Sequence, residues 1–147
     1  QVFVHRDFHS RNLMVCNGDL GENPGILDFQ DAVKGSIVYD LVSLFKDAYI
    51  VWNEEEIMDW LIRYWEQAKQ NNLKVQDDFA EFYRDFEWMG VQRHLKVLGI
   101  FARLNYRDHK ANYLNDLPAV ENYLRMACER YKDLHPLLKL INKLGST

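Results

Sequence analysis

The chain has 147 residues, of which 48% are hydrophobic, 14% aromatic and 27% charged. Apolar and aromatic residues are too frequent for a disordered protein, so the composition predicts a globular chain with one core. The 18 Lys and Arg against 22 Asp and Glu give a net charge of −4. This balance lacks the basic excess of non-specific nucleic-acid binding and the polybasic run that attracts a protein to anionic membranes.

The cysteine content and the chain start indicate the compartment. Cys16 and Cys128 lie far apart and form no C-x-x-C pair, so we expect reduced thiols in a cytoplasmic protein and no disulfide scaffold. No apolar stretch approaches about 18 residues, so we expect no membrane-spanning helix. The segment Gln1–Val4 does not resemble a signal peptide, and the absence of an initiating Met indicates a piece of a longer protein.

Short β-like runs and turn formers fill the first 37 residues. Val2–Val4 is rich in branched and aromatic residues, which favours a strand. We predict a small hairpin whose arms are Leu13–Val15 and Gly25–Leu27. Asn17-Gly18 favours a tight turn between the arms, because both residue types tolerate positive φ.

From about residue 38 the spacing of apolar residues becomes helical. Apolar positions at three- and four-residue steps predict a helix over Tyr39–Trp52. Asn53 followed by Glu56 resembles a capping box at the start of a second helix. Glu54-Glu55-Glu56 is then the negative first turn of that helix rather than an acid–base pair.

Three more helices are predicted beyond residue 76. Asp77 or Asp78 opens a long one, in which Gly90 and Gly99 weaken the helical pattern. Pro118 suits the first turn of the next helix. A last short helix begins at Pro136, and Gly145 can end it. The predicted fold class is mainly α with a small β-hairpin.

The three histidines in the C-terminal half of the chain do not suggest a metal site. His94 lies on an otherwise apolar helical stretch, so we expect a hydrogen-bonded core histidine rather than a metal ligand. His109 and His135 are expected at the surface. The aromatic stripes along the helices are expected to pack in the core.

The segment His5-Arg6-Asp7-Phe8-His9-Ser10-Arg11-Asn12 carries the chemistry, together with Asp28, which follows Asn12 by 16 residues. Oxygen donors such as Asn12 and Asp28, flanking a turn, suit Mg²⁺. Asp7 precedes Asn12 by five residues, so a loop can hold its carboxylate beside the metal without ligating it. Phosphoryl transfer needs this arrangement, because a carboxylate accepts the proton of the attacking hydroxyl while metal ions neutralise the phosphates.

The motif H-x-D-x-x-x-x-N followed by an Asp resembles the catalytic loop and metal-binding Asp of kinases. The second motif reads Asp-Phe-Gln rather than Asp-Phe-Gly. Its longer context, Leu27–Gly35 with Tyr39-Asp40-Leu41, resembles the aminoglycoside phosphotransferase and choline kinase family. Within that family, Phe3–Val15, Gly25–Leu44 and Gln92–Leu104 are most similar to bacterial kinases that phosphorylate N-acetylmuramate and N-acetylglucosamine at the anomeric hydroxyl.

The resemblance implies a role for each matched residue. Asp7 would be the catalytic base, and Asn12 and Asp28 would hold Mg²⁺ on the phosphates of ATP. His5 would be a structural brace of the catalytic loop, and Asp40 would tie that loop to the start of a helix.

Four further residues have less settled roles. Arg6 stands where the family most often has glycine, which leaves its role open. His9 and Arg11 are candidates to contact substrate or phosphate, or they solvate the loop. Asp31 is a candidate to touch substrate or metal, with a solvated loop carboxylate as the equal alternative.

The resemblance covers only the C-terminal catalytic lobe of a protein-kinase-like fold, so residues 1–147 are expected to lack the N-terminal nucleotide-clamping lobe. The implied protein is a cytoplasmic, ATP- and Mg²⁺-dependent phosphotransferase acting on an amino-sugar hydroxyl in cell-wall recycling, with nucleotide and acceptor as its partners. Alone, the chain should bind ATP weakly, be inactive and expose the apolar surface that meets the other lobe. A non-catalytic helical binding module or kinase relic, and a Mg²⁺-dependent phosphohydrolase, remain the alternatives.

Overall fold

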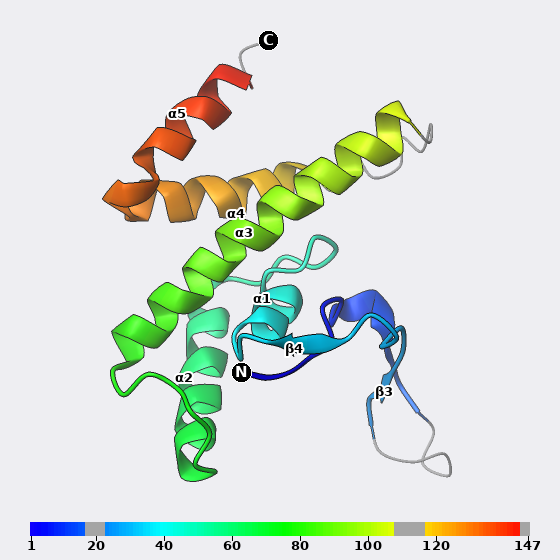
Figure 1. Cartoon of the computed structure of the whole chain (residues 1–147), viewed down its shortest axis with the longest axis vertical. Helices are drawn as coiled ribbons and strands as arrows, with labels where there is room; N and C mark the ends of the chain where they lie inside the picture. Colours follow the sequence, from blue (N-terminus) through cyan, green and yellow to red (C-terminus); the bar gives the residue numbers. More distant parts are fainter. Residues whose placement is uncertain (17–22, 108–116, 145–147) are drawn as a thin grey trace. The chain divides into compact units, whose positions relative to one another are not determined.

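The computed structural model describes residues 1–16, 23–107 and 117–144 (Figure 1). The predicted Asn17-Gly18 turn, His109 and Gly145 lie outside the described residues. The chain divides into two compact units, Gln1–Phe86 and Glu87–Thr147. All of the candidate site residues belong to the first unit.

Among the described residues of the first unit, the strands form two small antiparallel sheets rather than one hairpin. β2 (Leu13–Met14) pairs with β3 (Gly25–Ile26), which confirms the predicted hairpin arms. β1 (Val2–Val4) pairs with β4 (Val33–Gly35), a strand that sequence patterning did not indicate (Figure 1). This second pairing brings the residues that follow β1 beside those that precede β4.

The first helix is shorter than predicted. α1 (Tyr39–Phe45) ends seven residues before Trp52, because Lys46 leaves the helical region with φ −117° and ψ 48°. Asp47 then turns its carboxylate to the amide of Ser10. The tertiary hydrogen bond between Asp47 and Ser10 therefore accompanies the end of α1, although the apolar spacing of the sequence continues to Trp52.

The second helix begins where its cap predicts. α2 (Glu54–Gln70) has Asn53 as N-cap, whose side chain accepts the Glu56 N–H at 2.8 Å. The three glutamates of the predicted first turn are exposed there. Carboxylates at this end are favourable because they face the positive end of the helix dipole.

The long helix α3 (Phe79–Tyr106) follows, and neither of its two glycines interrupts it. Asp78 precedes it and accepts the N–H of Ala80 at 2.9 Å. The core of the first unit consists of apolar side chains that are at most 9% exposed: Val4, Val38, Leu41, Val42, Ile57, Leu61, Ala68, Phe82 and Phe86.

The second unit contains the later part of α3, α4 (Leu117–Arg130), the 3₁₀ turn Lys132–Leu134 and α5 (His135–Leu144). Pro118 lies in the first turn of α4, and Pro136 is the second residue of α5, as the sequence predicts. The core comprises Val91, Leu124, Ala127, Cys128 and Ile141.

Polar residues are also buried in the second unit. His94 is 2% exposed and stacks on Tyr123 with ring centroids 5.3 Å apart, which agrees with a core histidine. Glu87 is 1% exposed and accepts a hydrogen bond from Arg130 at 3.0 Å. His135 is exposed, as predicted.

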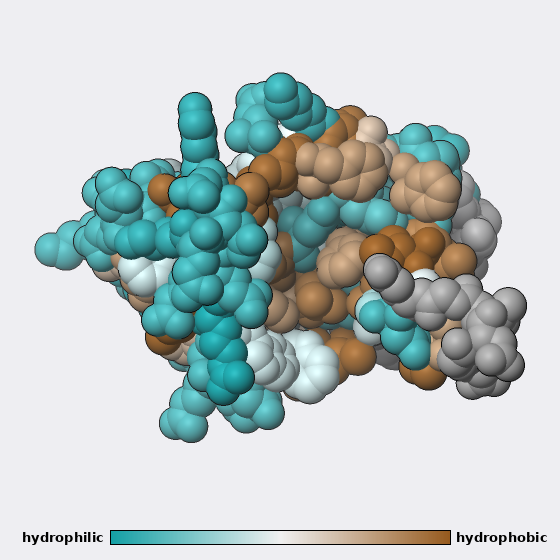
Figure 2. Space-filling view, turned by 90° about the horizontal axis from the view of Figure 1, so that it is seen from below, coloured by the Kyte–Doolittle hydropathy of each residue, from teal (hydrophilic) through white to brown (hydrophobic). Residues whose placement is uncertain are grey.

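Several large apolar side chains of the first unit are exposed. Phe3 is 72% exposed, Phe29 63% and Val51 66%. Figure 2 shows apolar side chains, in brown, exposed beside hydrophilic ones, in teal. Among the residues that the structure describes, no helix has the length and apolar character to cross a membrane.

Candidate active site

The loop between β1 and β2 is held to α1 by the carboxylate of Asp40. The backbone N–H of His5 donates to Asp40 Oδ2 at 2.7 Å, and that of Arg6 donates to Asp40 Oδ1 at 3.0 Å. Asp40 lies in the first turn of α1. Both carboxylate oxygens are therefore used to fix the direction in which the chain leaves β1.

Arg6 has an unusual backbone conformation, with φ 78°. This left-handed region favours glycine, because a side chain crowds the backbone there. The conformation turns two successive N–H groups toward Asp40. Glycine would adopt this conformation without such crowding. The Arg6 side chain donates to the carbonyl of Asp31 at 3.4 Å.

A second carboxylate, Asp47, holds the other end of the loop. Asp47 is 3% exposed and accepts the N–H of Ser10 at 3.0 Å, the hydroxyl of Ser10 at 2.5 Å and the N–H of Tyr49 at 3.1 Å. Sequence reasoning missed this residue because it read the segment as helix. The available signal was a carboxylate that, with Lys46, lies between the apolar runs Leu44-Phe45 and Ala48–Val51.

The short 3₁₀ turn Ser10–Asn12 connects Asp7 to Asn12. The carbonyl of Asp7 accepts the N–H of His9 at 3.0 Å and the side-chain amide of Asn12 at 2.9 Å. Because Asn12 uses its Nδ2 for this bond, its Oδ1 is the atom that remains to accept a hydrogen bond or ligate a cation.

Asp28 is brought to the same region by the backbone of Leu27. The Leu27 N–H donates to the carbonyl of Asn12 at 2.9 Å, and its carbonyl lies 2.8 Å from Nε2 of the buried His5. Asp28 follows with φ 65° and an exposed side chain. Gln30, the departure from Asp-Phe-Gly, donates to one oxygen of the Asp28 carboxylate.

The donor set fits Mg²⁺ in chemistry. Asn12 offers an amide oxygen and Asp28 a carboxylate, and Mg²⁺ typically takes one or two protein oxygens together with water and substrate phosphates. No group of three His, Cys, Asp or Glu side chains suited to a metal occurs among the described residues. An all-protein metal cage is therefore absent from this part of the chain, whereas a substrate-completed site needs no such cage.

Tyr49 packs against two side chains of the loop. Its ring lies 5.4 Å from the ring of His9 in an edge-to-face contact, and the Cζ of Arg11 lies 3.5 Å from its centroid. Arg11 is exposed, so its charge faces solvent beside the loop.

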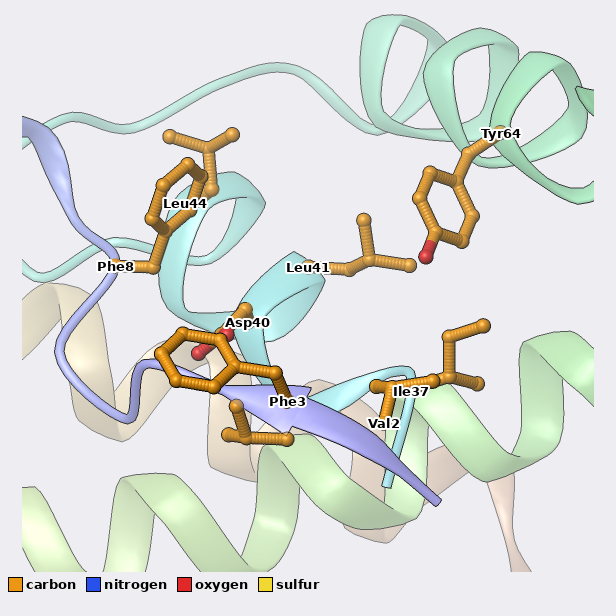
Figure 3. Close-up of a pocket in the computed structure, with 9 residues that line it drawn as sticks. Val2, Phe3, Phe8, Ile37, Asp40, Leu41, Leu44 and Tyr64 are labelled. Carbon is orange, nitrogen blue, oxygen red and sulfur yellow. The ribbon is translucent and has the colours of Figure 1, made fainter. Parts of the chain in front are cut away.

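An apolar pocket of about 180 Å³ borders the loop at Phe8 and α1 at Asp40 (Figure 3). The hydroxyl of Tyr64, from α2, points toward Leu41 in this pocket. Burial raises the pKa of Tyr64 above its ordinary value, and the negative charge of Asp40 raises it further. Tyr64 therefore stays a neutral phenol beside Asp40 at physiological pH.

Comparison with known proteins now identifies the family. Residues 1–82, more than half of the chain and including every candidate site residue, match the phosphotransferase enzyme family. The chain belongs to the phosphotransferase enzyme family. The resemblance drawn from the motifs is thereby confirmed.

Phosphotransferases named N-acetylmuramate/N-acetylglucosamine kinase are among its relatives. The chain is 57% identical to that of Neisseria meningitidis over 98% of its own length and 42% of the relative's. It is 46% identical to that of Pseudomonas putida over 98% of its length and 41% of the relative's. It is 36% identical to that of Caulobacter vibrioides over 84% of its own length and 32% of the relative's. The chain thus spans less than half the length of these phosphotransferases.

Proposed function

We propose that this chain carries the catalytic residues of a kinase that transfers the γ-phosphoryl group of ATP to a hydroxyl of an amino sugar, N-acetylmuramate or N-acetylglucosamine. The observation that supports the proposal is a hydrogen-bonded unit in which the Asn12 side chain donates to the carbonyl of Asp7 and the Leu27 N–H donates to the carbonyl of Asn12. It ties the base candidate Asp7 and the ligand candidate Asn12 to the backbone that directly precedes Asp28. The choice of acceptor rests on the names of the relatives.

In this proposal Asp7 orients the acceptor hydroxyl and accepts its proton as the new O–P bond forms. The bond from the γ-phosphorus to the bridging oxygen breaks, and that oxygen leaves with ADP. Asn12 and Asp28 would hold Mg²⁺, which supplies neutralisation of charge on the phosphates. Gln30 orients the Asp28 carboxylate through its amide. Little covalent work remains for the protein, so positioning of these groups dominates catalysis.

His5 and Asp40 serve as positioning residues. Asp40 aligns the loop through two backbone N–H groups, and His5 links the loop to the residue before Asp28. The fold that this implies is the C-terminal lobe of a kinase-like protein, and the rest of the polypeptide would close the nucleotide site. Both cysteines are free, which supports a cytoplasmic location. The further part of the proposal, a role in the recycling of cell-wall sugars, rests on the names of the relatives.

The test uses the full-length gene product that contains this chain, with ATP and N-acetylmuramate, N-acetylglucosamine, choline or an aminoglycoside as acceptor. We expect ATP-dependent phosphorylation of the two amino sugars. Asp7→Ala should lower kcat by about 10²- to 10⁴-fold, the usual contribution of a general base, with little change in stability.

Asp133→Asn, which changes an exposed carboxylate of the second unit, is the matched control and should retain activity. Unaltered transfer in Asp7→Ala would reject the assignment of the base. Release of phosphate from ATP without any sugar product would indicate a phosphohydrolase. Complete absence of nucleotide turnover in the wild-type enzyme would favour a binding module.

A further inference from the structure

We propose that Arg11, stacked on the ring of Tyr49, binds the carboxylate of N-acetylmuramate and so determines how the enzyme discriminates between its two sugar acceptors. This inference rests on the proposed function and adds to it a residue that recognises one substrate. It is carried by the position, the support and the charge of this arginine.

The position places a cation inside the reacting loop. Arg11 lies four residues after the proposed base Asp7 and directly before the proposed ligand Asn12. A group bound at Arg11 would therefore lie on the same loop as the base that the acceptor hydroxyl is proposed to meet.

The support for Arg11 is unusually firm for an exposed side chain. The buried carboxylate of Asp47 accepts hydrogen bonds both from Ser10, the residue before Arg11, and from the backbone of Tyr49. The turn that carries the cation and the ring on which it rests are thus fixed by one carboxylate. Preorganisation of this kind reduces the entropy lost when a ligand binds.

The guanidinium is also available to an anion. Its Cζ lies 3.5 Å from the Tyr49 centroid, so the face of the guanidinium is used and its N–H edges remain for a bidentate carboxylate. No carboxylate forms an ion pair with Arg11 among the residues that the structure describes. Arg6, the other arginine of the loop, instead donates to a backbone carbonyl.

The two acceptors differ in the group that an arginine recognises. N-acetylmuramate carries a lactyl ether with an anionic carboxylate, whereas N-acetylglucosamine has a neutral hydroxyl at the same carbon. A cation beside the acceptor therefore strengthens the binding of the first sugar and leaves the second nearly unaffected.

The test compares kcat/KM for the two sugars in the full-length gene product. Arg11→Met should lower kcat/KM for N-acetylmuramate by about 10- to 100-fold, the usual effect of losing a hydrogen bond between charged groups, and much less for N-acetylglucosamine. The loss should appear in KM, because the carboxylate contact is the same in ground and transition states. Added salt should raise the N-acetylmuramate KM of the wild type more than that of the variant.

Variants of the supporting ring extend the test. Tyr49→Leu removes the stacking face and should lower the ratio of kcat/KM for N-acetylmuramate to kcat/KM for N-acetylglucosamine, as Arg11→Met does. Tyr49→Phe keeps that face and should preserve this ratio. Arg63→Met is the matched control, because Arg63 is an exposed arginine on α2 paired with Asp59. It should leave the ratio unchanged.

Other outcomes overturn the inference. An unchanged ratio in Arg11→Met would exclude a role in discrimination. An equal loss on both sugars with a raised KM for ATP would assign Arg11 to a phosphate instead, while the proposed function would stand. A wild-type enzyme that phosphorylates neither sugar would reject both proposals.

Discussion

At the scale of single residues, Arg6 adopts a strained backbone conformation that positions the loop against Asp40. A residue with a side chain loses roughly 1–2 kcal/mol in the left-handed region, and Arg6 adopts it with φ 78°. This conformation directs the N–H groups of His5 and Arg6 at the carboxylate of Asp40. The loop therefore keeps a strained residue where glycine would have no strain.

We predict that Arg6→Gly stabilises the protein. Relief of the strain outweighs the greater freedom of glycine in the unfolded chain, so the free energy of unfolding should rise by about 0.5–1 kcal/mol in urea denaturation. Arg6→Ala retains the Cβ and loses the guanidinium, and it should give no increase. An equal gain in both variants would show that the side chain, not the backbone, is responsible.

The residues of the loop were predictable from sequence to different degrees. His5, Asp7 and Asn12 share the motif H-x-D-x-x-x-x-N, and Asp28 follows it, so the local sequence is enough to propose all four. Asp47 belongs to no motif, and its importance depends on a contact with Ser10 across 37 residues. Which atoms of each side chain remain available is also a tertiary property.

At the scale of elements, two carboxylates, Asp40 in the first turn of α1 and Asp47 just beyond its end, hold opposite ends of one loop.

We predict that Asp47→Ala lowers the free energy of unfolding by about 2–4 kcal/mol, because the amides of Ser10 and Tyr49 lose their acceptor. Urea denaturation measures this loss, and Asp47→Asn should lose less because one oxygen remains. Asp59→Ala removes an exposed carboxylate and should change stability by less than about 0.5 kcal/mol. Equal effects of the two alanine variants would contradict the role of Asp47 in holding this end of the loop.

In the second unit, the contact between the start of its α3 segment and α4 depends on an ion pair. Arg130→Met leaves the carboxylate of Glu87, which is 1% exposed, without this partner. We expect the free energy of unfolding to fall by about 2–3 kcal/mol. This is no more than breaking a fully buried ion pair costs, because the Arg130 side chain is partly exposed. The double variant Glu87→Gln/Arg130→Met should recover part of the loss in the same thermal or urea measurements. A single variant as stable as the wild type would show that the pair contributes little.

The helices were largely predictable because their signals are local. Asn53 and Pro118 mark two helix starts correctly, and the apolar spacing outweighs both glycines of α3. The end of α1 and the strand Val33–Gly35 were not predictable. Each depends on a partner about 30 to 37 residues away, which no local pattern reports.

At the scale of the whole molecule, exposed apolar side chains predict self-association. Phe3 and Phe29 are 72% and 63% exposed on a chain that spans 42% of the length of a relative. We expect the isolated chain to form larger species in sedimentation velocity as its concentration rises, since apolar patches of this kind are normally covered. The double variant Phe3→Thr/Phe29→Thr should shift the distribution toward the monomer.

Leu140→Thr is the control for that measurement, because Leu140 is 53% exposed on α5 of the second unit. It should leave the distribution close to that of the wild type. A wild-type chain that stays monomeric at all concentrations would contradict the interpretation of these side chains as a covered surface.

The short length of α1 has a consequence for what this protein tolerates. A helix turns by about 100° per residue, so α1 acts as a spacer that sets the angle between Asp40 at its start and Asp47 just beyond its end. Replacement of its outward-facing residues would preserve that angle. Insertion or deletion of a single residue would swing one carboxylate away from its amides, so related chains are expected to vary α1 in composition but not in length.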